Sequence, residues 1–141
     1  MSKLNPDIGT WKLNLGKSTF PPGYPVPKEW TMVVSVVGDH VEATSTRTEA
    51  NGSIMSSKCR FPEAGGILTF DGRAPAELAD LTLVHAVVSP NEFYSTALKD
   101  GRQHWLEHGV ISEDGKTKSA TVTGRDSQGK SLQVVAVFDR Q

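Results

Sequence analysis

The sequence predicts an all-β protein, a closed antiparallel up-and-down β-barrel of about 8–10 strands. Short segments rich in β-branched and aromatic residues follow one another at even spacing, with turn sequences such as Asn51-Gly52 between them. The first and last segments are themselves strand-like, as expected when a sheet closes on itself. At 141 residues, the chain is expected to form one domain over residues 1–141.

The N-terminal half predicts one strand, a stiff loop and three further strands. Trp11, Leu13 and Leu15 alternate with polar residues and indicate the first strand. The four prolines in 21–27 cannot donate ladder hydrogen bonds, so this segment is expected to be a loop or lid at the barrel entrance. A β-branched run and two turns then predict strands at 29–37, 40–50 and 53–61.

Residues 44–49 are polar on both faces of their predicted strand. Such a strand suits an exposed edge, or it lines a wet part of the interior with Arg47 directed at an anionic group of a ligand. We expect the edge position.

The C-terminal half continues the same pattern. A short strand is expected at 67–70, and one helical turn fits 71–80. The turns that follow are rich in Gly, Asn, Asp and Ser, and they separate strands expected at 81–88, 92–99, 102–111, 116–124 and 130–138.

Composition excludes several classes of partner. The formal net charge is −1 and no basic run is present, which argues against nucleic acid. The apolar stretches are far too short for a membrane span. The N-terminal residues lack the pattern of a signal peptide, and the single cysteine fits a reducing compartment, so a cytoplasmic protein is expected, as a monomer or homodimer.

Four motifs carry a family resemblance. The chain has Gly9-Thr10-Trp11-Lys12-Leu13-Asn14, then Lys17-Ser18-Thr19-Phe20-Pro21-Pro22-Gly23, and later Asp114-Gly115-Lys116-Thr117 and Asp126-Ser127-Gln128-Gly129-Lys130. With these motifs it resembles bacterial lipocalin-like proteins of the calycin superfamily, which includes the lipocalins and fatty-acid-binding proteins. Most of the bacterial proteins have no assigned activity.

The resemblance implies a barrel that holds a small molecule, with Trp11 against Arg140 at one end. Relatives in this group usually have Leu where this chain has His85 and Arg where it has His108, and they usually carry signal peptides.

Two of the four histidines, His104 and His108, alternate with Leu106 on one predicted strand. As a two-residue turn, Asp100-Gly101 places Ser95 opposite Leu106. The two histidines would then share the face of Ser95, and this face is mostly apolar.

His85 is expected to join this face. A loop at 89–91 places His85 opposite Ser95, whereas a loop one residue longer turns it to the other face, and we prefer the shorter loop. The expected interior contains two groups of residues. The candidate catalytic residues are His85, Ser95 and His108, and the candidate ligand-binding residues are Trp30, Met32, Val34, Phe93, His104, Leu106 and Phe138.

Metal and cofactor chemistry are not expected. The string from His104 to His108 matches the H-x-x-E-H zinc pattern, but on a strand the two imidazoles stand about 13 Å apart, too far to share one ion. The chain has neither a dinucleotide nor a phosphate-binding glycine motif, so no cofactor is indicated.

Two functions fit these residues. The first is binding of a small, largely hydrophobic and aromatic molecule inside the barrel. The alternative is a cofactor-free isomerase, lyase or cyclase in which His85 and His108 exchange protons with such a molecule and Ser95 orients it.

Overall fold

The computed structural model describes residues 6–72, 78–125 and 128–141. Its described strands form one antiparallel sheet of 11 strands in the order β5-β7-β8-β9-β10-β11-β1-β2-β3-β4-β6. The strands are β1 (Gly9–Leu13), β2 (Glu29–Val37), β3 (His40–Thr48), β4 (Ile54–Pro62), β5 (Gly66–Ile67), β6 (Thr69–Phe70), β7 (Thr82–Ser89), β8 (Glu92–Lys99), β9 (Arg102–Ile111), β10 (Thr117–Arg125) and β11 (Ser131–Arg140), and a 3-10 helix, η1 (Leu15–Lys17), follows β1. The all-β prediction is confirmed.

Two expected features extend beyond the described residues. The helical turn fitted to 71–80 includes 73–77, and the turn at 126–129 includes 126–127; both short stretches lie outside the described ranges. Within those ranges, the structure has no helix that is long and apolar enough to cross a bilayer.

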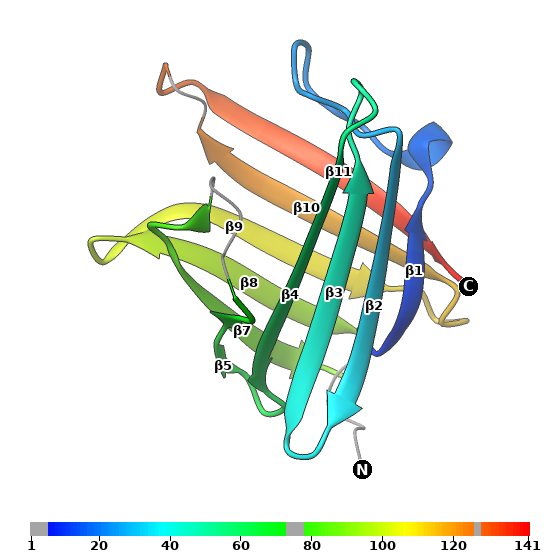
Figure 1. Ribbon diagram of the computed structural model, residues 1–141, viewed down its shortest axis with the longest axis vertical. Coiled ribbons are helices and arrows are strands. Elements are labelled where there is room, and N and C mark those ends of the chain that lie inside the picture. The colour runs from blue at the N-terminus through cyan, green and yellow to red at the C-terminus, as the bar shows by residue number, and fades with distance from the viewer. Residues whose placement is uncertain (1–5, 73–77, 126–127) are drawn as a thin grey trace.

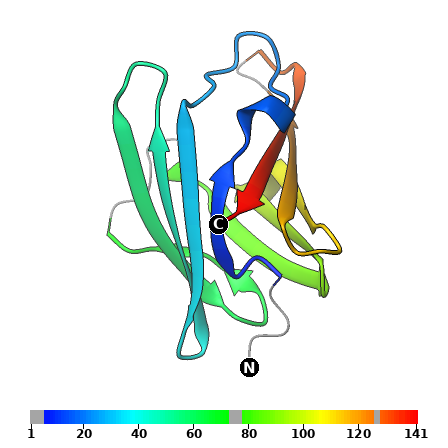
Figure 2. The same cartoon turned by 90° about the vertical axis from the view of Figure 1, so that its right-hand side faces the viewer.

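The sheet folds into a nearly closed barrel with two facing halves. Strands β2–β4 cross in front of β8–β11, and the view turned by 90° shows the two layers face to face (Figures 1 and 2). Residues 66–70 connect the two edges of the sheet, because β5 pairs with β7 and β6 pairs with β4. The proline-rich loop lies at the same end as the β3–β4 turn, at the top of Figure 1.

The packed core occupies the interior near the other end of the barrel. One cluster of buried side chains comes from β1, β8, β9 and β11, and a second comes from β2, β3 and β4. The first contains Trp11, Leu13, Phe93, Ile111, Ala136 and Phe138, and the second contains Val34, Val41 and Phe61.

The first and last strands meet at a tryptophan–arginine contact. Trp11 pairs with Arg140 across the β1–β11 ladder, and the Arg140 guanidinium lies 4.2 Å from the centre of the Trp11 ring. Arg140 also donates hydrogen bonds to the carbonyls of Ile8 (2.7 Å) and Gly115 (2.6 Å). A Cβ on Gly9 would lie 2.1 Å from the Arg140 guanidinium, so the Gly-x-Trp spacing leaves room for the arginine. The expected contact between Trp11 and Arg140 is confirmed.

Replacing this tryptophan should destabilise the whole barrel. Trp11 is 0% exposed, and Trp11→Ala is expected to lower the free energy of unfolding by about 3–5 kcal/mol, the usual loss for a buried aromatic side chain. Urea unfolding measures this loss of free energy. Val33→Ala, on the exposed face of β2, is the control and should change stability by less than about 0.5 kcal/mol. A loss below about 1 kcal/mol for Trp11→Ala would contradict this role.

Candidate ligand-binding interior

The register of β9 differs from the prediction because of one extra residue. The Asp100-Gly101 turn is as expected, with Lys99 opposite Arg102, but the pairing then shifts between Ala97 and Leu98. On β9, His104 is the additional residue, a β-bulge that moves every later residue to the other face of the strand.

The bulge reverses which residues of β9 face inward. Ser95 lies opposite Glu107, and the expectation that it faces Leu106 is wrong. The inward face is shown by Gly109, where an added Cβ would lie 2.1 Å from the buried Phe93 ring. The inner face of β9 therefore carries Trp105, Glu107, Gly109 and Ile111.

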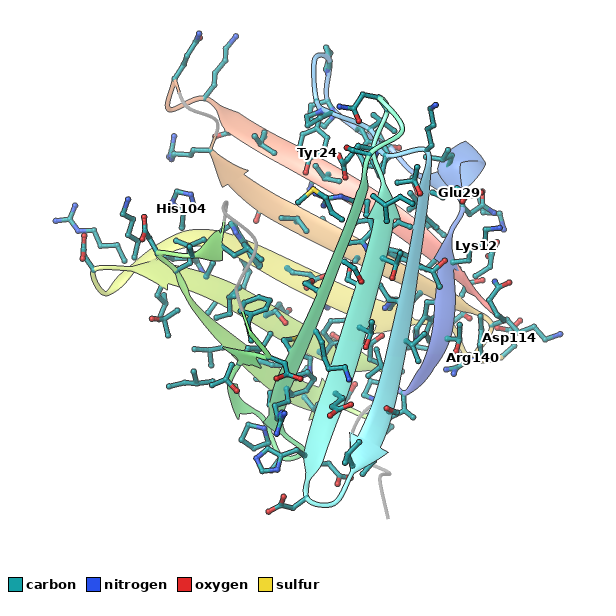
Figure 3. All side chains as sticks on the ribbon, viewed as in Figure 1. Lys12, Tyr24, Glu29, His104, Asp114 and Arg140 are labelled. Atoms are coloured by element: carbon teal, nitrogen blue, oxygen red, sulfur yellow. The ribbon has the colours of Figure 1, made fainter. Side chains whose placement is uncertain are left out.

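Three of the predicted site residues lie outside the interior. His108 stacks on Tyr94 at 4.4 Å on the outer face and contacts the Glu92 carboxylate at 2.9 Å. Leu106 shares this outer face. His104 is exposed near the β8–β9 hairpin (Figure 3). None of these three contributes to an internal site, and the bulge is the physical reason.

His85 lies on the inner face opposite Ser95, the position expected from the sequence. It pairs with Ser95, and His85 Nδ1 lies 3.0 Å from Ser95 Oγ. The imidazole is 4% exposed and lies between the rings of Phe61 and Phe93, at 4.4 and 5.2 Å. Its Nε2 has no hydrogen-bond partner among the described residues. Burial lowers the pKa of His85, a neighbouring Asp7 opposes this shift, and Lys118 adds to it. The ring is therefore neutral at physiological pH.

Glu107 extends this pair into a polar row. His85, Ser95 and Glu107 are cross-strand neighbours on β7, β8 and β9, all on the inner face. Glu107 is half-buried, and burial raises the pKa of its carboxyl to about 7, although the positive charge of Lys118 opposes the shift. We call these three side chains the polar row.

A buried ion pair lies near the polar row. Lys118 on β10 is 2% exposed and contacts the Asp7 carboxylate at 2.6 Å. Its ammonium also lies 5.0 Å from the Trp11 ring and 4.9 Å from the Phe138 ring. The lysine is therefore neutralised and enclosed within the core.

The expected apolar wall faces inward. Val34 and Phe138 are fully packed, whereas Trp30 and Met32 are only partly buried beside the core. Phe93 lies in the same core. The Trp30 ring donates a 2.7 Å hydrogen bond to Ser45 on the neighbouring strand.

The polar strand is not an edge. β3 lies between β2 and β4, so the expected edge position is wrong. Arg47 pairs with Trp30 across the β2–β3 ladder and lies 5.6 Å from its ring centre. It also forms an ion pair with Glu49.

Burial of the inward-facing residues decreases along the strands toward one end. On β4, Phe61 is buried while Met55 is 37% exposed, and on β9 Ile111 is buried while Trp105 is half-buried. The same gradient occurs on β3, β10 and β11, and on β2 from Val34 to Trp30. We call the partly exposed inward-facing residues the open half: Trp30, Met32, Met55, Trp105, Val122 and Leu132. Aromatic and aliphatic side chains there still contact solvent.

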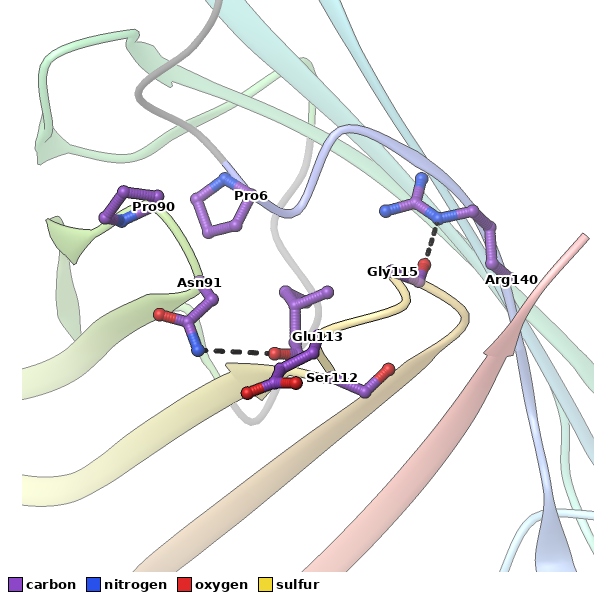
Figure 4. A pocket seen from close by; sticks show the side chains of 8 residues that line it. Pro6, Pro90, Asn91, Ser112, Glu113, Gly115 and Arg140 are labelled. Atoms are coloured by element: carbon purple, nitrogen blue, oxygen red, sulfur yellow. Dashed lines mark hydrogen bonds between the residues drawn. The ribbon is translucent and has the colours of Figure 1, made fainter.

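Two surface depressions lie elsewhere on the described part of the chain. One, of about 480 Å³, is near the Trp11–Arg140 end and is bordered by Pro6, Asn91 and Arg140 (Figure 4). The other, of about 530 Å³, lies at the β8–β9 hairpin and includes His104. Both are wide open to solvent and neither contains a residue of the polar row.

Sequence reasoning missed Glu107, Trp105 and Lys118 as interior residues. One signal was available for the first two. A glycine within a strand often marks close approach of a large side chain, and Gly109 therefore pointed to an inward face for the odd-numbered residues of β9. Lys118 gave no such signal, because its partner Asp7 is distant in sequence.

Comparison with known proteins shows the fold. No family model matches the chain, and no curated protein has a significantly similar sequence. Among solved structures, zebrafish ileal bile acid-binding protein complexed with cholic acid aligns with a TM-score of 0.55 at 12% identity, covering 97% of this chain and 100% of that one. The chain therefore has the same fold as this bile acid-binding protein.

Two further structures align more weakly. A de novo designed fluorescence-activating β-barrel has a TM-score of 0.46 at 13% identity, with 100% of this chain and 99% of that chain covered. The siderocalin Ex-FABP has a TM-score of 0.42 at 10% identity, with 97% of this chain and 71% of that chain covered.

The buried carboxyl should make stability depend on pH. Since the folded-state pKa of Glu107 is raised, the folded protein holds its proton between pH 4.5 and about 7, and stability falls as pH rises through this range. Glu107→Gln removes the ionisation. The difference in free energy of unfolding between this variant and the wild type should therefore depend on pH. It should favour the variant by about 1–2 kcal/mol more at pH 8 than at pH 5.

Urea unfolding at both pH values measures this difference. Glu29→Gln, on the outer face of β2, is the matched control and should behave as the wild type does. An equal effect of Glu107→Gln at pH 5 and pH 8 would contradict a buried, ionising Glu107.

Proposed function

We propose that the protein binds a small, largely hydrophobic molecule in the open half of the barrel. The supporting observation is that apolar side chains face inward there yet remain partly exposed. Each buried Å² of apolar surface contributes about 25 cal/mol, so these residues are the part of the interior that gains most from a hydrophobic occupant. Trp30 and Trp105 favour a molecule with an aromatic part.

The entrance proposed for this molecule is beside the proline-rich loop. Tyr24 in that loop stacks on Phe20 at 5.7 Å, and Phe20 packs against the core. The loop is thereby held next to the open half, near the β3–β4 turn (Figure 3). The bile acid-binding protein that shares this fold has cholic acid as its ligand, which agrees with binding of a small amphipathic molecule.

The two-histidine catalytic alternative is not supported. It required His85 and His108 on one inner face, but His108 lies on the outer face against Tyr94. His85 is buried beside Ser95, and its lowered pKa makes it a weak base. The proposed role of the interior is therefore binding.

We extend this proposal to the family group, the location and the oligomeric state expected from the sequence. The motifs around Gly9 and Lys17 support membership in the bacterial lipocalin-like group. A cytoplasmic location and a monomeric or homodimeric state are proposed with it, and the free thiol of Cys59, whose pKa burial raises to about 11, fits a reducing compartment.

Binding can be tested with N-phenyl-1-naphthylamine, a neutral hydrophobic dye that fluoresces in apolar surroundings. We expect saturable binding to the wild type. Trp105→Ala should weaken binding about tenfold, which corresponds to about 1.4 kcal/mol of lost contact.

Leu106→Ala is the matched control, because Leu106 is adjacent in sequence but on the outer face of β9. It should leave the dye affinity unchanged, and circular dichroism checks that both variants keep the fold. Absence of saturable binding, or equal weakening by the two substitutions, would overturn the proposal.

A further inference from the structure

Some charged side chains of the interior have a partner of opposite charge, and one does not. Lys118 is neutralised by Asp7 at 2.6 Å, and Arg47 forms an ion pair with Glu49, the residue that follows β3. Glu107, in contrast, has no hydrogen bond or ion pair with any residue in the described parts of the chain. When it ionises, its cationic neighbour is Lys118, which is already paired with Asp7.

The polar row has a second group without a hydrogen-bond partner. His85 Nε2 is buried and has no partner, while its Nδ1 is occupied by Ser95. Across the sheet, His85 and Glu107 are two strands apart, about 10 Å between their backbones, with Ser95 between them. A buried polar atom without a partner is costly, so an occupant that gives it one is favoured.

Aromatic side chains occupy inner-face positions next to Glu107. Trp105 precedes Glu107 by two residues on the same inner face, and Phe93 lies opposite Gly109, the next inward position. A carboxylate beside aromatic faces suits a cation, because the rings attract positive charge and the carboxylate supplies its counter-ion. An anion would meet Glu107 with the same sign of charge.

We propose that the hydrophobic ligand carries a protonated amine and that this ammonium pairs with Glu107 on the polar row. This inference rests on the proposed binding function and specifies its ligand class. Ser95 is the cross-strand neighbour of Glu107, so its hydroxyl is the next polar group that the ammonium would meet. The apolar part of the ligand then extends along Trp105 toward the open half.

The pairing makes affinity depend on pH in one direction. The titratable and charged groups near Glu107 are His85 from β7, Lys118 from β10 and Asp7 from the N-terminal segment. Glu107 must be ionised to hold the ammonium, and the pKa of its carboxyl is about 7 in the free protein. Affinity for an amine should therefore fall as pH decreases below 7, because binding must then release a proton.

The test compares dansylcadaverine, which has a fluorescent naphthalene and a primary ammonium, with its N-acetylated form, which is neutral. At pH 8 the amine should bind the wild type at least about tenfold more tightly than the acetylated probe. At pH 5.5 this advantage should be lost, while binding of the acetylated probe stays constant.

Two variants locate the effect. Glu107→Gln should abolish the preference for the amine at pH 8 and leave the acetylated probe unchanged. Glu29→Gln removes a carboxylate from the outer face and should retain the full preference. The wild-type pH comparison needs no substitution, so it tests the inference even if Glu107→Gln fails to fold.

The outcomes separate this inference from the proposed function. If the acetylated probe and N-phenyl-1-naphthylamine bind but the amine has no advantage, the amine assignment is overturned and hydrophobic binding stands. The same holds if the preference persists in Glu107→Gln. If no probe binds, both are overturned.

Discussion

The extra residue at His104 determines which side chains the barrel encloses. Side chains alternate along a strand, so one inserted residue exchanges the inner and outer sets beyond it. With the bulge, Trp105 and Glu107 face inward and His108 faces solvent. The interior therefore contains one carboxyl next to a histidine–serine pair, instead of two histidines.

The two ends of the interior differ in how completely their polar groups are satisfied. Near Trp11, the Lys118 ammonium has a carboxylate partner and two aromatic rings around it. Breaking a buried pair of this kind is costly because it leaves an isolated charge, so this end is fixed. Toward the open half, Glu107 lacks such a partner. One end of the interior is therefore rigid, with its charged groups paired, and the other end has an unpaired carboxyl. This arrangement is expected of a preformed ligand-binding site.

Local patterns were sufficient to predict most of the fold. Alternation and turn chemistry gave nearly every strand within a few residues and placed His85 opposite Ser95. The structure reaches this register through a two-residue turn at 90–91 and a bulge at Val88, in place of the expected loop at 89–91. The position of the bulge could not be predicted from Gln103 or His104, and the only signal of the changed face lay farther along β9, at Gly109. The Asp7–Lys118 pair was also beyond local reasoning, because it joins segments 111 positions apart. The candidate site was therefore half predicted, on β7 and β8 but not on β9.

The pairing of β1 with β11 has a consequence for how the chain folds during synthesis. Trp11 leaves the ribosome long before its ladder partner Arg140. The barrel cannot close until β11 has been synthesised, and until then β1 has only β2 as a ladder partner. Contacts this distant in sequence slow folding, and the unclosed apolar face is open to aggregation meanwhile. A nascent chain stalled before residue 131 would lack β11, and holdase chaperones would be expected to bind it.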